Sequence, residues 1–195
     1  MIEFNLSKKS FIGGWFIDEK VCDDLIKFFN NTDQKGPGEV YHFGKQVVKK
    51  DRKDSTETSF DPESDIKEWS NYKTELQKVL NLYLKKYPEA NDVAKFGLVE
   101  GANLQHYKPD SGYYSWHAER QGISTRHLVF MTYLNDVDDG GTEFKNQNIK
   151  LPAKKGLTTI WPTDWTHTHR GVISKTQDKY IITGWFNYVK WKLFR

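Results

Sequence analysis

Apolar side chains in the first half of the chain recur every three or four residues, which is the period of a helix. Asp18 can cap one such helix, ending at Asn30-Asn31, whose apolar stripe contains Val21, Leu25, Ile26, Phe28 and Phe29. A longer helix fits the segment from Asp61-Pro62 to the residue before Pro88, where the stripe contains Ile66, Trp69, Leu76, Val79, Leu80, Tyr83 and Leu84. We expect both helices to pack on the outside of a sheet.

From Gly97 the pattern changes to short apolar runs separated by turn residues, which is typical of a sandwich or barrel. The predicted strands lie near residues 99–107, 113–119, 127–134, 142–144, 149–151, 157–161, 167–173 and 179–188. The turns between them are Pro109-Asp110-Ser111-Gly112, Asn135-Asp136 through Gly140-Gly141, and Lys154-Lys155-Gly156.

These elements predict an α+β fold with a double-stranded β-helix core, also called a jelly roll, and N-terminal helices packed outside it. We expect a single domain over residues 1–195, with a helical supporting part at 1–96 and the jelly-roll core at 97–188. Between the helices, Gly36-Pro37-Gly38 and the charged stretch Lys45 to Lys53 indicate a loop or an exposed hairpin. We favour a solvated loop there over a lid that contacts substrate.

Composition narrows the classes of function. The 29 basic and 26 acidic residues give a net charge of only +3, so no strong electrostatic signal for nucleic acid follows. The single cysteine, Cys22, excludes an internal disulfide, and no apolar run reaches the length of a membrane span. Residues 1–9 lack the apolar core of a signal peptide. We therefore expect a cytoplasmic protein that does not act at a membrane.

Candidate chemistry lies in the second half. His117 and Glu119 are two residues apart, so on a strand they share one face, and His169 lies on a later strand. Two imidazoles and one carboxylate can hold a mononuclear iron and leave half of its octahedron open. A histidine two residues before an acid arises by chance about once in a chain of this composition, so the pair alone is weak. Lys179 adds a cation ten positions after His169.

A longer match surrounds this pair. The segment Leu104-Gln105-His106-Tyr107-Lys108-Pro109-Asp110-Ser111-Gly112-Tyr113-Tyr114-Ser115-Trp116-His117-Ala118-Glu119 resembles the first metal strand of the prolyl 4-hydroxylase-like branch of Fe(II)/2-oxoglutarate dioxygenases. The resemblance continues in the order of that family through Tyr133-Leu134-Asn135, Gly140-Gly141-Thr142-Glu143-Phe144, Gly156, Ile160-Trp161-Pro162, His169-Arg170-Gly171 and the run Lys179 to Trp185. It covers residues 97 to 188 and is nearest to the small phage and bacterial members.

The resemblance implies a role for each matching residue. His117, Glu119 and His169 would bind Fe(II), and Lys179 would pair with the distal carboxylate of 2-oxoglutarate. Other matching residues would line the co-substrate site, namely Tyr107, Tyr133 and Thr183, and Trp185 would line the same strand as Thr183. A lysine at the cation position is similar to the collagen-type hydroxylases, and nucleic-acid demethylases of the superfamily typically carry paired arginines. One departure is Glu119, because this branch usually has aspartate there, and the extra methylene must be absorbed by another rotamer or a shifted metal.

The implied reaction consumes O2 and 2-oxoglutarate, releases succinate and CO2, and hydroxylates an aliphatic C–H. Peptidyl proline giving 4-hydroxyproline is the favoured substrate, so the partner would be a protein or peptide that contains proline, and ascorbate is a candidate reductant. A phage-encoded member would act in the host cytosol. Three alternatives stay open: hydroxylation of a free amino acid or another protein side chain, a non-catalytic jelly-roll binding module, and a nucleic-acid demethylase, which the small net charge disfavours.

Several nearby residues have competing interpretations. His167 shares the predicted strand face of His169, but only His169 has the ten-residue step to Lys179. Arg120 is either a substrate contact or a plain exposed arginine. Gly140-Gly141 fit a turn, and Gly171 can let the backbone run close to the ligands. The remaining histidines, to which we assign no role, are His42, His106 and His127.

Overall fold

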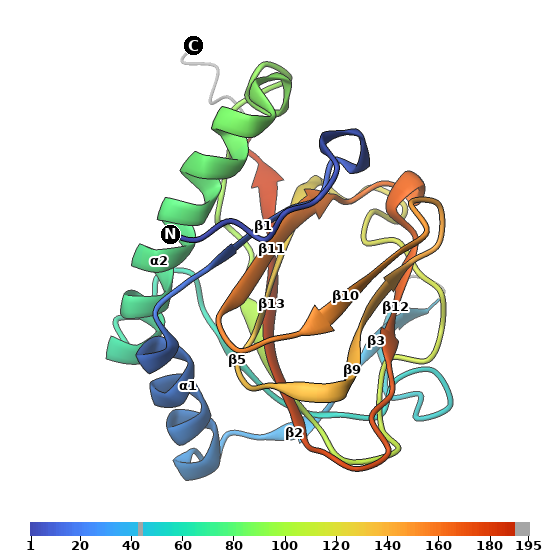
Figure 1. The fold of residues 1–195 in the computed structure, drawn as a ribbon. Coiled ribbons are helices and arrows are strands. Elements are labelled where there is room, and N and C mark those ends of the chain that lie inside the picture. The colour runs from blue at the N-terminus through green and yellow to red at the C-terminus, as the bar shows by residue number, and fades with distance from the viewer. Residues whose placement is uncertain (43–44, 190–195) are drawn as a thin grey trace.

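The computed structural model describes residues 1–42 and 45–189, and Figure 1 shows their arrangement. Two long helices, α1 (Glu19–Asn31) and α2 (Lys67–Lys86), lie side by side against one large sheet. Short 3-10 helices span Lys8–Ser10, Pro88–Asn91 and Trp165–His167. None of the described helices combines the length and the apolarity that a membrane crossing requires.

Both helices form where the apolar stripes predict them. Helix α1 begins after Asp18, whose side chain accepts a hydrogen bond from the Lys20 amide at 2.9 Å. Helix α2 ends before Pro88 as expected, but it begins at Lys67 and not near Asp61-Pro62. The prediction was too early because Asp61 forms a local turn, in which its side chain accepts from the Glu63 amide at 2.8 Å.

The strands form two facing sheets and one separate hairpin. The large sheet has the order β1 (Gly13–Phe16), β11 (Leu157–Pro162), β8 (Arg126–Tyr133), β13 (Lys179–Tyr188), β7 (Ala102–Tyr107), β5 (Thr56–Phe60) and β2 (Gly36–Pro37), and β6 (Phe96–Gly97) also pairs with β13. The small sheet has the order β10 (Ile149–Ala153), β9 (Val137–Phe144) and β12 (His169–Val172). All of these pairings are antiparallel.

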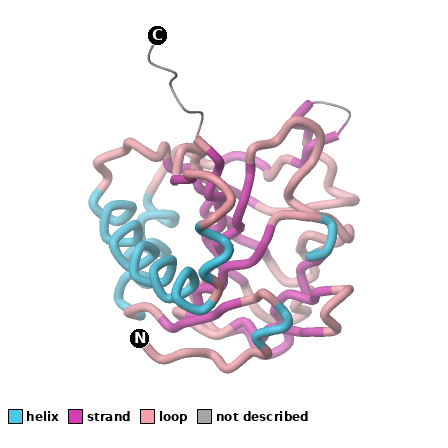
Figure 2. The backbone as a smooth tube through the Cα atoms, turned by 90° about the horizontal axis from the view of Figure 1, so that it is seen from above, coloured by secondary structure: helices cyan, strands magenta, loops and turns pink. Residues whose placement is uncertain are grey.

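Figures 1 and 2 show the helices on one side of the large sheet and the small sheet on the other. The prediction of outer helices is therefore confirmed. Strands β1, β2 and β5 come from the first half of the chain, where no strand of the sheet was predicted. They were missed because each is short, and β1 and β5 contain little of the period-two apolar alternation that marks a half-buried strand.

Side-chain alternation along the central strands divides the core into two layers. On β8, Leu128 and Phe130 pack with the helices, whereas Val129, Met131 and Tyr133 pack between the sheets. Strand β13 repeats the pattern, with its even-numbered Ile182 and Phe186 on the helix side and its odd-numbered Ile181 and Trp185 between the sheets. Since successive side chains of a strand alternate between faces, odd positions of β13 all point toward the small sheet.

Two local predictions were wrong. Residues 113–119 form no continuous strand, because their backbone bonds to several different segments: Tyr113 bridges to Lys53, His117 bridges to His169, and Glu119 bonds to the Thr163 carbonyl. Gly140 and Gly141 are not turn residues, because they lie inside β9. Opposite Gly141 the register of β10 shifts between Leu151 and Ala153, which indicates a β-bulge.

The predicted hairpin between the two helices is formed by β3 (Val40–His42) and β4 (Lys45–Val47), and β4 begins the charged stretch. The hairpin is not merely solvated, because Val40, Tyr41 and Gln46 line the main cavity of the molecule. The sequence favoured a solvated loop only because that is the commoner outcome for such a segment.

The backbone conformation of Gly141 predicts that any side chain at this position destabilises the protein. Its φ is +125°, and a Cβ added there would lie 2.1 Å from the Leu151 carbonyl oxygen. We expect Gly141→Ala to lower the free energy of unfolding by about 3 kcal/mol, since backbone strain and a main-chain clash add. Gly36→Ala is the matched control, because nothing lies within 4 Å of its Cβ position. Urea denaturation of both variants measures the difference, and equal small changes would contradict it.

Candidate functional site

Three side chains predicted as metal ligands converge at one end of the cavity. His117 lies on the irregular segment and His169 is the first residue of β12, and their backbones exchange two hydrogen bonds at 3.0 and 2.9 Å. Oε1 of Glu119 lies 3.4 Å from Nε2 of each histidine. The ligand atoms all lie within 4.8 Å of one another, and this is the one such group of His, Cys, Asp or Glu in residues 1–42 and 45–189.

Hydrogen bonds on the far side of each imidazole assign its tautomer. Nδ1 of His117 lies 3.0 Å from the Ser115 carbonyl, and Nδ1 of His169 lies 2.9 Å from the His167 carbonyl. A carbonyl only accepts, so each Nδ1 carries a proton, and Nε2 of each ring, which faces the Glu119 carboxylate, is the nitrogen available to a metal. Burial, with a further contribution from His169, lowers the pKa of His117 and favours the neutral ring. Three lone-pair donors that face one another are satisfied by a cation.

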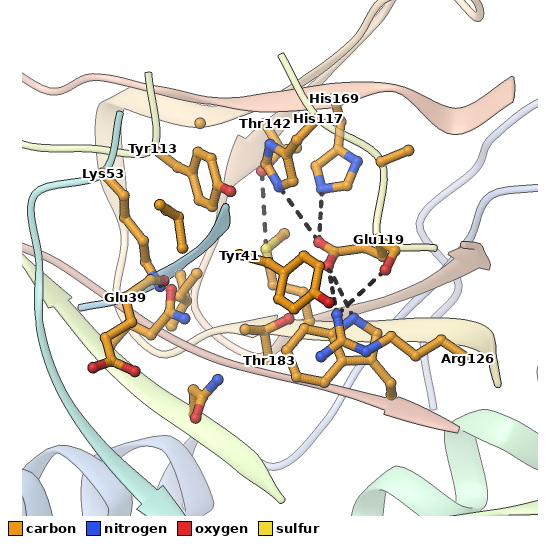
Figure 3. Close-up of a pocket in the computed structure, with 18 of the residues that line it drawn as sticks. Glu39, Tyr41, Lys53, Tyr113, His117, Glu119, Arg126, Thr142, His169 and Thr183 are labelled. Carbon is orange, nitrogen blue, oxygen red and sulfur yellow. Dashed lines mark hydrogen bonds and ion pairs between the residues drawn. The ribbon is translucent and has the colours of Figure 1, made fainter. Parts of the chain in front are cut away.

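This donor set fits ferrous iron. Two imidazole nitrogens and one carboxylate oxygen form the facial arrangement that non-haem Fe(II) oxygenases use, with coordination positions left for other ligands. The side chains are nearly buried, with 8 % of each histidine and 14 % of Glu119 exposed. Figure 3 shows both imidazoles on one side of the Glu119 carboxylate and Arg126 on the other.

A cavity of about 730 Å³ opens beside this group. Its walls include all of the other predicted site residues, namely Tyr107, Tyr133, Lys179 and Thr183, and they also include Trp185. Three of them, Lys179, Thr183 and Trp185, are odd-numbered residues of β13 and therefore share the face that points toward the small sheet. The structure thus brings the predicted residues together, and their individual roles remain predictions.

Lys179 is a buried cation with no carboxylate partner. It is only 4 % exposed, and its Nζ donates to the Val172 carbonyl at 2.7 Å and lies 5.2 Å from the centre of the Tyr107 ring. Within the described residues, no acid lies at ion-pair distance from it. Burial lowers the pKa of Lys179 to about 8, against the smaller opposing effect of Asp139.

The other two cations on the cavity wall are already neutralised. Lys53 forms an ion pair with Glu57 at 2.5 Å, and both side chains are nearly buried. Arg126 contacts Glu100 and Glu119. A dicarboxylate that enters the cavity therefore meets Lys179 as the cation without an acidic partner, which is the position predicted from sequence.

Three hydroxyls predicted to lie at the co-substrate have partners within the protein. Tyr107 donates to Gln105 at 2.7 Å, Tyr133 donates to Thr142 at 2.7 Å, and the Thr183 hydroxyl donates to the Phe130 carbonyl at 3.0 Å. Burial raises the pKa of both tyrosines, so they stay protonated. Each phenol can turn its proton toward a bound carboxylate.

Several cavity residues were missed from sequence. Tyr113 stacks on the His117 ring, with centroids 3.7 Å apart and an interplanar angle of 12°. Arg126 stacks on Trp185, and the first half of the chain supplies Glu39, Tyr41 and Lys53. None of these contacts leaves a periodic or spaced signal, because each joins segments far apart in the chain.

The residues with competing interpretations lie outside the triad. His167 bonds through Nε2 to the Ser10 carbonyl at 3.0 Å, so His169 is the histidine that faces Glu119. Arg120 pairs with Asp164 and does not line the cavity. Gly171 accommodates the Tyr113 backbone, which bonds to its amide.

The histidines without an assigned role have ordinary structural partners. His106 bonds to Asp178 at 2.6 Å, and His127 bonds to the Ala90 carbonyl and the Tyr188 hydroxyl. The side chain of His42 lies outside the described part of the chain.

Comparison with known proteins identifies the region that holds the site. Residues 102–187 match the model of the 2OG-Fe(II) oxygenase superfamily, and this range contains His117, Glu119, His169 and Lys179. A search of curated proteins returned no match.

Solved structures share the fold over most of its length. A prolyl-4-hydroxylase from Pseudomonas putida has a TM-score of 0.68 at 15% identity, covering 92% of this chain and 93% of that one. A viral collagen prolyl hydroxylase from Paramecium bursaria Chlorella virus-1, solved with 2OG, has a TM-score of 0.67 at 19% identity, covering 92% and 97%. A Trichoplax adhaerens prolyl hydroxylase, solved with a hypoxia inducible factor peptide, has a TM-score of 0.68 at 12% identity, covering 89% and 83%.

At these identities the likeness shows the fold, and it confirms the predicted jelly roll with outer helices. The family match extends over the strands that carry the ligand triad and the buried lysine. Residues 102–187 of this chain therefore match the 2OG-Fe(II) oxygenase superfamily, and the chain as a whole shares its fold with solved prolyl hydroxylases.

Proposed function

We propose that this protein is an Fe(II)- and 2-oxoglutarate-dependent dioxygenase that hydroxylates a peptidyl proline to 4-hydroxyproline. In this proposal His117, Glu119 and His169 bind the metal and Lys179 pairs with the distal carboxylate of 2-oxoglutarate. Tyr107, Tyr133 and Thr183 line the co-substrate site. The products are the hydroxylated substrate, succinate and CO2.

One observation carries the proposal. A triad of two histidines and one carboxylate shares a cavity with a buried lysine that has no acidic partner among the described residues. An unpaired buried charge costs several kcal/mol, so such a lysine is expected where a ligand supplies the opposite charge. A binding module without catalysis needs neither three facing lone-pair donors nor a cation behind them.

Different residues would bind the metal, orient the co-substrate and limit the access of water. Iron, when bound with 2-oxoglutarate, supplies the oxidising chemistry that activates O2. Nε2 of both histidines and Oε1 of Glu119 hold the metal, and the Nδ1 hydrogen bonds fix the planes of the imidazoles. The Lys179 ammonium orients the co-substrate by its far end. The walls between the two sheets limit water, and the substrate carbon must be held close to the metal.

The choice of proline rests on the solved structures of similar fold, which are prolyl hydroxylases, one of them bound to a peptide. The cavity also has an open rim formed by Tyr41 and Ile123, which are 51 % and 101 % exposed and suit contact with a peptide chain. The alternative substrates are a free amino acid or another protein side chain. Nucleic acid is disfavoured further, because the ammonium of Lys53 in the basic stretch is buried and paired with Glu57.

The proposal also includes a reductant and a location in the cell. Ascorbate is proposed as the reductant that keeps the iron ferrous, on the family resemblance alone. A cytosolic location, including the host cytosol for a phage-encoded protein, is consistent with Cys22 being a buried free thiol.

Substrate choice can be tested by mass spectrometry. Proline-rich peptides incubated with protein, Fe(II), 2-oxoglutarate and ascorbate should gain one oxygen atom on proline, with one succinate formed per hydroxylation. Replacing each proline by alanine is the control and should abolish the mass shift. Oxygen found on a different residue would contradict the prolyl assignment while leaving the dioxygenase assignment intact.

The metal ligands can be tested by comparing two neighbouring histidines. His169→Ala should reduce succinate formation at least about a hundredfold, because the metal loses one of three protein ligands. His167→Gln should retain activity, since the His167 side chain bonds to Ser10 and not to Glu119. Equal losses in the two variants, measured in folded protein, would contradict the assignment of His169.

The pKa of Lys179 predicts how co-substrate binding depends on pH. Below about pH 8 the free lysine is charged, and above it binding a dicarboxylate must take up a proton, so affinity should fall about tenfold per pH unit. Calorimetric titration of the Mn(II)-loaded protein with 2-oxoglutarate measures this slope. Lys179→Arg should bind more weakly but lose the slope, because a guanidinium stays charged. The same slope in both proteins would show that Lys179 is not its source.

A further inference from the structure

The two oxygens of the Glu119 carboxylate have different surroundings. Oε1 faces both histidines, at 3.4 Å from each Nε2. Oε2 points the other way, where it accepts a hydrogen bond from Nε1 of Trp185 at 3.1 Å and lies 3.5 Å from Nη1 of Arg126. Figure 3 shows this division, with the imidazoles and the Arg126 guanidinium on opposite sides of the carboxylate.

The groups that hold Oε2 are themselves fixed. The Arg126 guanidinium lies flat against the indole of Trp185, with Cζ 3.4 Å from the ring centre, and it forms an ion pair with Glu100. Nε of Arg126 donates to Oε2 of Glu100 at 3.0 Å. Oε2 of Glu100 also accepts a hydrogen bond from the side-chain Nδ2 of Asn187 at 3.1 Å, which connects Glu100 and Arg126 to β13. Trp185 is 8 % exposed and lies on the same strand, β13.

The two donors at Oε2 leave it without a lone pair for a metal. A carboxylate oxygen has two lone pairs, and the two donors at Oε2 use both of them. Oε1 faces the two Nε2 atoms, which are the nitrogens available to a metal because each Nδ1 bonds to a backbone carbonyl. A metal held by the histidines therefore meets one oxygen of Glu119 and not both.

We infer that Trp185 is a positioning residue that holds Glu119 as a single-oxygen metal ligand and so accommodates glutamate at a position where aspartate is usual. The inference rests on the proposed function. An aspartate side chain is shorter by about 1.5 Å, so it cannot reach the histidines and the Trp185 indole together. The extra methylene of Glu119 spans that distance. Trp185 is the better anchor of the two donors because its N–H is closer and its ring is buried in the sheet.

A double-mutant cycle on Co(II) binding tests the inference without turnover. Trp185→Phe removes the N–H and keeps an aromatic ring, so Co(II) affinity should fall about tenfold. The visible d–d absorption should also weaken, because a released Oε2 adds a second oxygen to the metal and raises its coordination number. In a Glu119→Asp background the same Trp185→Phe change should alter the affinity less than about twofold and leave the spectrum unchanged, since no contact remains to be lost.

Trp69→Phe is the matched control for losing a buried indole. Its Nε1 has no hydrogen-bond partner among the described residues, and it lies on α2 and stacks on Phe60, away from the cavity, so Co(II) affinity should not change. Thermal unfolding of each metal-free variant separates a loss of fold from a loss of metal. Equal Trp185→Phe effects in both backgrounds, or none in either, would overturn the inference alone. Failure of the wild-type protein to bind Co(II) would overturn the proposed function with it.

Discussion

The paired backbone hydrogen bonds between His117 and His169 are the interaction on which the site depends. They join an irregular segment to the first residue of β12, and the Arg170 guanidinium on the same strand lies over the Trp116 ring. Both histidines then direct Nδ1 to a carbonyl two residues earlier in their own segment, Ser115 in one case and His167 in the other. The same local geometry at both positions turns both Nε2 atoms toward one point, and Glu119 supplies the third ligand from the next turn of chain.

Charge is distributed in the cavity in a way that selects its ligand. Lys53 and Arg126 have acidic neighbours, whereas Lys179 has a carbonyl and an aromatic face. A backbone carbonyl and a ring quadrupole stabilise an ammonium less than a carboxylate does, which is why burial still lowers the pKa of Lys179. The arrangement favours an anion of defined length, with one end at the ammonium and the other at the metal.

Sequence reasoning recovered the parts of the molecule that periodicity and order in the chain determine. The stripe from Val21 to Phe29 placed α1, and the short apolar runs after Gly97 placed β12 and β13, which carry His169 and Lys179. It failed where the backbone is held by contacts between distant segments. Residues 113–119 read as a strand because their alternation resembles one, but their hydrogen bonds go to three separate places.

The contacts of Glu119 show the same limit at the level of side chains. The sequence indicates that a longer acid must be accommodated, but the indole of Trp185 and the guanidinium of Arg126 reach it only after β8 and β13 have paired. Gly141 is a comparable case, since its positive φ lies opposite the bulge in β10, a distant segment of the chain. Side chains that meet through tertiary structure leave no local pattern to read.

The division of β8 and β13 into a helix face and a cavity face bears on how this protein can change over evolutionary time. Residues such as Phe130 and Ile182 anchor the helices, and their immediate neighbours in sequence face the ligand space. Adjacent positions of these strands lie in different environments, one against the helices and one in the cavity. Mutations that change the cavity residues therefore need not disturb the packing that keeps the protein folded. Such a layout permits new substrate preferences to arise by small steps on an unchanged scaffold.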